Sequence, residues 1–139
     1  MTPKDARPPA YSRSRWLWLG YWLALFVVMH IPIQPHGMPR VAHLDKVVHF
    51  VMYFVLAWLG GRYFLASGRV SNALILLWAS ACIAYAALDE WLQQFVGRET
   101  SLADWTADVV GVVAAGVVIA LTRRRMSRTV RPAGMRESR

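Results

Sequence analysis

Four long apolar stretches limit what this sequence can fold into. The stretches are residues 16–33, 47–66, 73–93 and 103–122. A helix that crosses the hydrocarbon core of a bilayer needs about 20 predominantly apolar residues, because that core is about 30 Å thick. The links between the stretches are short, which favours antiparallel neighbours. We therefore expect an all-α protein, a bundle of four transmembrane helices with one domain at residues 16–122.

The first stretch follows a basic leader, as the apolar part of a signal peptide does. It is too long for an ordinary signal-peptide core, and it ends at His30-Ile31-Pro32 instead of a small-residue cleavage site. We expect an uncleaved anchor. In the last stretch Ala107, Gly111 and Ala115 recur every four residues, a spacing of small side chains that lets helix backbones approach closely in lipid.

Positive charge is concentrated in the two tails of the chain. The formal net charge is +8, of which residues 1–15 contribute +3 and residues 123–139 contribute +6, so residues 16–122 carry −1. Lys and Arg accumulate on the cytoplasmic side of membrane proteins. We expect both tails to be cytoplasmic and the C-terminal tail to be flexible. Its arginines adjoin a span, so we expect contact with anionic lipid and no nucleic-acid partner.

Ionisable side chains gather at the other end of the predicted spans, which faces outward. Such groups are costly within a membrane and commonly mark a functional site. Two pairs, Asp45 with His49 and Asp104 with Asp108, are four residues apart, so each pair shares a helix face. The candidate binding residues are Asp45, Lys46, His49, Glu90, Gln93, Arg98, Asp104 and Asp108.

Three kinds of chemistry fit this set. We favour a buried network in which Arg98 clamps one carboxylate and Lys46 pairs with another, and which fixes the helices or binds a polar head group. Alternatively, His49, oriented by Asp45, or Glu90 could act as a catalytic acid or base. A divalent cation is disfavoured because no spacing matches a ligand motif, so we expect no metal and no cofactor. For His30, His36 and His43 we expect solvated or interfacial positions.

The same residues resemble the VanZ-like family. Its pattern has D-K-x-x-H on one span, E-x-x-Q at the end of the next, an arginine shortly after, and D-x-x-x-N-x-x-G in the last span. In this chain the four pieces are Asp45-Lys46-x-x-His49, Glu90-x-x-Gln93, Arg98 and Asp104-x-x-x-Asp108-x-x-Gly111. The resemblance covers about residues 41–120. Asp108 stands where the family has asparagine; if it faced Asp104, one carboxylate would be protonated or paired with a cation.

The resemblance implies a small multi-pass protein of the bacterial cytoplasmic (inner) membrane and cell envelope. The namesake of the family is associated with resistance to the glycopeptide teicoplanin. We favour a non-enzymatic protein whose outward pocket binds a membrane lipid head group, a lipid-linked cell-wall precursor or a lipophilic glycopeptide. The alternatives are a small membrane enzyme acting on a lipid-linked or phosphorylated substrate, and a proton- or ion-coupled transporter. The transporter ranks last because the cytoplasmic halves of the spans show no polar path.

Overall fold

The protein is built from α-helices, and the predicted all-α class is confirmed. The computed structural model describes residues 10–31, 44–98 and 100–129, and these contain no strand. The elements are α1 (Ala10–His30), α2 (Leu44–Ala66), α3 (Asn72–Gln93), the short 3-10 helix η2 (Gln94–Val96) and α4 (Leu102–Thr129). Most of the predicted N-terminal tail, and the C-terminal tail from residue 130 onward, lie outside the described residues.

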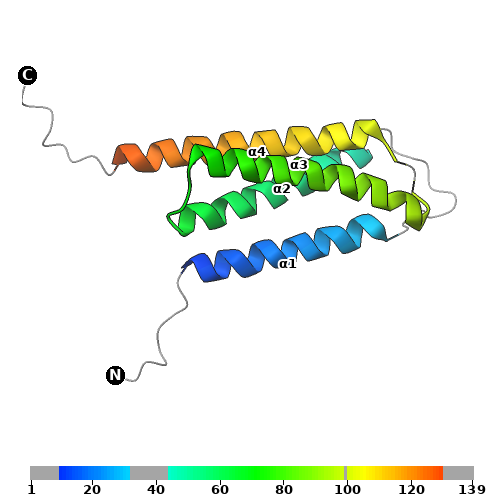
Figure 1. The fold of residues 1–139 in the computed structure, drawn as a ribbon, viewed down its shortest axis with the longest axis horizontal. Helices are drawn as coiled ribbons and strands as arrows, with labels where there is room; N and C mark the ends of the chain where they lie inside the picture. Colours follow the sequence, from blue (N-terminus) through cyan, green and yellow to red (C-terminus); the bar gives the residue numbers. More distant parts are fainter. Residues whose placement is uncertain (1–9, 32–43, 99, 130–139) are drawn as a thin grey trace, which may run out of the picture.

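Consecutive helices run in opposite directions along one bundle (Figure 1). The end of α1, the start of α2, the end of α3 and the start of α4 therefore lie together, and we call this the site end. The start of α1 and the last turns of α4 lie at the opposite end. The most extensive contact joins α2 and α4.

The close contact of α2 and α4 depends on Gly111. A Cβ atom added at this position would collide with the carbonyl oxygen of Phe50 and would lie 3.0 Å from the backbone nitrogen of Phe54. Both obstacles are backbone atoms of α2, so the two helices could not stay at their present separation. Gly111 therefore lies at a close contact with a neighbouring helix, as the spacing predicts, and Ala115 is also buried.

The apolar surface of the bundle is typical of a membrane protein. Three helical segments are long and apolar enough to cross a membrane, namely residues 44–66, 72–96 and 102–126. Large apolar side chains are also exposed on the outside, among them Leu76, Leu77 and Val113. The described part of α1 is not among the three segments. It contains three tryptophans and two tyrosines as well as Arg13 and Arg15, which lower its hydropathy.

Two helices extend beyond the apolar stretches that predict them. Helix α1 begins at Ala10, six residues before Trp16, and α4 continues to Thr129, seven residues past residue 122. The first part of the predicted C-terminal tail is thus helical. Arginine is a good helix former, and its charge at a helix C-terminus complements the helix dipole. Arg123 also donates a hydrogen bond to the side chain of Asn72, which joins the last turns of α4 to the start of α3.

Candidate functional site

Three ionisable side chains from three helices meet inside the site end. His49 of α2, Glu90 of α3 and Asp108 of α4 are all buried, and one nitrogen or oxygen atom of each lies within 4.8 Å of the others. The Nδ1 atom of His49 is 3.1 Å from Oδ1 of Asp108 and 3.7 Å from Oε1 of Glu90. We call these residues the buried cluster. Three of the eight candidate residues, each from a different helix, therefore meet at the centre of the site.

The position of each residue along its helix explains the convergence. His49 lies in the second turn of α2, Asp108 lies in the second turn of α4, and Glu90 lies in the last turn of α3. Since neighbouring helices alternate in direction, these three positions fall at one level of the bundle. A charged group that faced lipid at this level would lose its hydration without gaining a partner. The polar faces consequently turn toward each other.

Lys46 occupies the rim of the site end, beside the buried cluster. Its Nζ atom donates to Oδ2 of Asp45 at 3.1 Å and to Oδ1 of Asp104 at 3.2 Å. The predicted pairing of Lys46 with a carboxylate is thus observed. The prediction that Asp45 orients His49 is wrong: the side chain of Asp45 is 52% exposed and points to Lys46, and the histidine bonds to Asp108. Asp45 lies in the first turn of its helix, where the solvated rim is within reach.

Asp104 and Asp108 have separate partners on α2, although they share a helix. Asp104 accepts from Lys46 at the rim, and Asp108 lies against the imidazole of His49 one turn deeper. The residue at the position where the VanZ-like pattern has asparagine is therefore a fully buried carboxylate with a specific partner on α2.

Arg98 makes a contact different from the predicted one. Its guanidinium nitrogen donates to the backbone carbonyl of Met29 at 2.7 Å, near the end of α1. Among the described residues, no carboxylate lies within ion-pair distance of it. The positive φ of 79° at Gly97 and the bond from Arg98 N to the carbonyl of Gln93 reverse the chain here. An arginine that binds a last-turn carbonyl also complements the helix dipole of α1.

Glu90 and Gln93 contact different groups, although they share a helix face. The Oε2 atom of Glu90 accepts a hydrogen bond from the backbone N–H of Ser101 at 2.9 Å, which ties α3 to the segment before α4. The side-chain amide of Gln93 donates to Oδ2 of Asp89 at 3.3 Å. Gln93 is buried, so its amide holds Asp89 inside the bundle.

His30 and Asp89 also belong to the site, although neither is among the eight candidate binding residues. Asp89 is 1% exposed, and its Oδ1 atom lies 3.7 Å from Nδ1 of His30, whose side chain is 13% exposed. His30 is therefore not solvated, and an interfacial position stays a prediction. His36 and His43 lie outside the described residues. The end of α1 packs against the site end, and no motif in the sequence indicates that contact. The adjacent acids of α3 were the available signal, because two carboxylates within an apolar span both need partners.

The three buried carboxylates outnumber the two imidazoles beside them. Asp89, Glu90 and Asp108 are all at least nine-tenths buried. In the described residues, only imidazole nitrogens lie within ion-pair distance of these three carboxylates. Lys46 is paired with two other acids. The site can therefore accept a cation or a proton, and it presents one carboxylate–imidazole pair suited to proton transfer.

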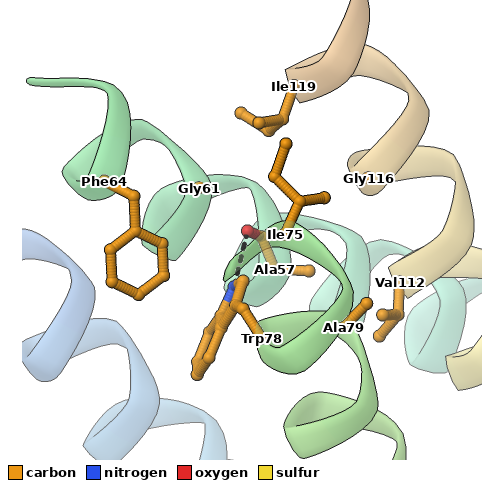
Figure 2. A pocket seen from close by; sticks show the side chains of 9 residues that line it. All are labelled: Ala57, Gly61, Phe64, Ile75, Trp78, Ala79, Val112, Gly116 and Ile119. Carbon is orange, nitrogen blue, oxygen red and sulfur yellow. Dashed lines mark hydrogen bonds between the residues drawn. The ribbon is translucent and has the colours of Figure 1, made fainter. Parts of the chain in front are cut away.

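A separate cavity lies toward the opposite end, between α2, α3 and α4 (Figure 2). Its volume is about 10 Å³, and its lining is apolar apart from the indole of Trp78, whose N–H donates to the carbonyl of Ala57 at 3.0 Å. A cavity of this size holds one water at most, and a water needs polar partners to stay. We therefore assign it to packing.

The fold and the site define a helical bundle with three segments long and apolar enough to cross a membrane and a buried polar cluster at one end. Comparisons of the chain with protein-family models, with curated proteins and with solved structures found no match.

Proposed function

We propose that the chain is a VanZ-like protein of the bacterial cell envelope whose site end binds the phosphate-bearing head group of a lipid or of a lipid-linked cell-wall precursor. In this arrangement it resides in the cytoplasmic membrane with both tails inside and the site end outside. The basic tails support that orientation, because Lys and Arg accumulate on the cytoplasmic side.

The observation that carries the proposal is the environment of Arg98. This half-buried guanidinium lies at the site end, held by the Met29 carbonyl, and among the described residues no carboxylate neutralises it. Lys46 adds a second cation at the rim, with 35% of its side chain exposed. Guanidinium groups match the geometry of phosphate oxygens and are weakly hydrated, so they bind phosphate at partly buried sites.

Replacing Arg98 with alanine is expected to weaken head-group binding about tenfold or more, because a charge-assisted hydrogen bond contributes about 1.5–3 kcal/mol. The measurement is the affinity of the purified protein, in discs of neutral phosphatidylcholine, for a fluorescent polyprenyl pyrophosphate. Arg98→Lys keeps the charge without the planar fork and should give an intermediate affinity. Labelled teicoplanin serves as a second probe, for the glycopeptide alternative.

Arg69→Ala is the matched control for this experiment. Arg69 is exposed in the link between α2 and α3, at the opposite end of the bundle, so its loss should leave affinity for the pyrophosphate unchanged. The proposal fails if Arg98→Ala retains wild-type affinity with an unchanged melting temperature. It also fails if both alanine variants lose affinity equally, which would indicate general attraction to positive charge.

A second candidate function is acid–base catalysis on the same head group. The contact of 3.1 Å between His49 and Asp108 supports it, because a carboxylate orients an imidazole and stabilises its protonated form. Release of inorganic phosphate from the polyprenyl pyrophosphate, abolished in His49→Gln, would favour this function. A transporter has less support, because the buried carboxylates and the buried imidazole among the described residues all lie at the site end.

A further inference from the structure

We propose that His49, Glu90 and Asp108 together bind a divalent first-row transition-metal cation, Zn²⁺ or Mn²⁺. The inference deepens the proposed function and depends on it only for the group that completes the coordination, a phosphate oxygen of the head group. In the sequence the three ligands are 41 and 18 residues apart. No linear motif connects them, which is why the spacing alone favoured no metal.

Two of the three ligand separations are close to the required value, and all three ligand atoms lie within 4.8 Å of one another. Zinc binds imidazole nitrogen and carboxylate oxygen at about 2.0–2.2 Å, so two ligands of one ion lie roughly 3.0–3.5 Å apart. The Nδ1 atom of His49 is 3.1 Å from Oδ1 of Asp108 and 3.7 Å from Oε1 of Glu90. Small rotations of buried side chains would bring all three atoms around one ion.

The unused oxygen of Glu90 points independently to a ligand. Glu90 is 7% exposed, and its Oε1 atom has no hydrogen-bond partner. The other oxygen is fixed by the N–H of Ser101, so Oε1 is held in place, directed at the imidazole. A buried carboxylate oxygen without a partner is uncommon and calls for a bound cation or water.

Charge balance favours a divalent ion. The buried cluster contains two carboxylates and one imidazole, and the nearby Lys46 bonds to Asp45 and Asp104 instead. A divalent cation bound to both carboxylates and to a neutral imidazole leaves no net charge inside the apolar bundle. Imidazole is a ligand typical of zinc and other transition metals, whereas Mg²⁺ and Ca²⁺ prefer oxygen alone.

A metal at this position would explain how an acidic cluster receives an anion. Two carboxylates without a cation would repel a phosphate group. Three protein ligands leave at least one coordination position of the ion open, as in catalytic zinc sites. The open position can take a phosphate oxygen, while Arg98 and Lys46 lie at the same end of the bundle.

The test is a metal titration of the purified full-length protein in detergent. After treatment with a chelator, Zn²⁺ and Mn²⁺ are added separately, and bound metal is measured by mass spectrometry and by competition with a fluorescent chelator. We expect about one ion per chain and an affinity lowered tenfold or more in Asp108→Asn and in Glu90→Gln. Asp45→Asn is the matched control, because Asp45 is an exposed carboxylate outside the buried cluster, and its affinity should equal that of the wild type.

The outcomes separate this inference from the proposed function. Absence of stoichiometric metal in the wild type overturns the metal site, and so does equal affinity in Asp108→Asn and Asp45→Asn. If Asp108→Asn fails to fold, Glu90→Asp is the second variant. It keeps the negative charge but moves the carboxylate oxygen away from the ion. Unchanged metal affinity in Glu90→Asp would also overturn the metal site. Metal binding without binding of the polyprenyl pyrophosphate supports the metal site and contradicts the head-group proposal. Binding of the pyrophosphate without metal supports the head-group proposal and contradicts the metal site.

Discussion

His49→Leu in chelator-treated protein is expected to lower the free energy of unfolding by about 3–5 kcal/mol, the usual cost of removing one partner of a buried ion pair. The imidazole is 2% exposed, and the carboxylate of Asp108 beside it is fully buried. Leucine would leave the carboxylates of Asp108 and Glu90 inside the bundle without the imidazole that pairs with them. The measurement is unfolding in mixed micelles, followed by tryptophan fluorescence.

A double variant distinguishes lost pairing from lost packing. Leucine at both 49 and 108 removes the carboxylate along with the imidazole, and apolar replacements of a buried ion pair are commonly neutral or stabilising. The double variant should therefore recover most of the stability that His49→Leu loses, a non-additive result expected only for residues in contact. If the two single losses simply add, the contact between His49 and Asp108 does not contribute to stability.

Gly111→Ala is expected to destabilise the protein by about 2–3 kcal/mol, a large effect for one methyl group. The new Cβ atom would meet the Phe50 carbonyl oxygen, and a backbone atom cannot rotate away as a side chain can. Helices α2 and α4 must separate instead. His49 precedes Phe50, so the separation also moves the imidazole away from Asp108, and metal affinity should fall together with stability.

Gly116→Ala is the control for this prediction. Gly116 lies on the same helix, and a Cβ atom there would have nothing within 4 Å. Alanine is the better helix former by about 1 kcal/mol, so Gly116→Ala should be neutral or stabilising. Equal losses of stability in both variants would show that the effect comes from glycine in a helix and not from the contact between α2 and α4.

The architecture could be predicted because helices long and apolar enough to cross a membrane can be recognised directly in the sequence. Length and apolarity alone locate α2, α3 and α4, since the bilayer requires about 20 apolar residues per crossing. The position of the site could also be predicted, because His49, Glu90 and Asp108 lie at corresponding ends of antiparallel helices. Both inferences use only the order of residues along the chain.

The partners within the site could not be predicted in the same way. The four-residue spacing pairs His49 with Asp45, yet the imidazole contacts Asp108, which is 59 residues away. The rotation of each helix about its axis decides such pairs, and packing across the whole bundle determines that rotation. His30 and the Met29 carbonyl were missed for the same reason, because only the docking of α1 brings them to Asp89 and Arg98.

In a bilayer, the continuity of α4 would set the depth of the buried cluster. A helix rises about 1.5 Å per residue, so Asp108 lies about 22 Å along the axis from Arg123. With Arg123 at one surface of a hydrocarbon layer about 30 Å thick, the cluster lies about 8 Å below the far surface. A solute in water would have to descend that distance to reach the cluster. A molecule already anchored in the leaflet by its tail could approach sideways between the helices.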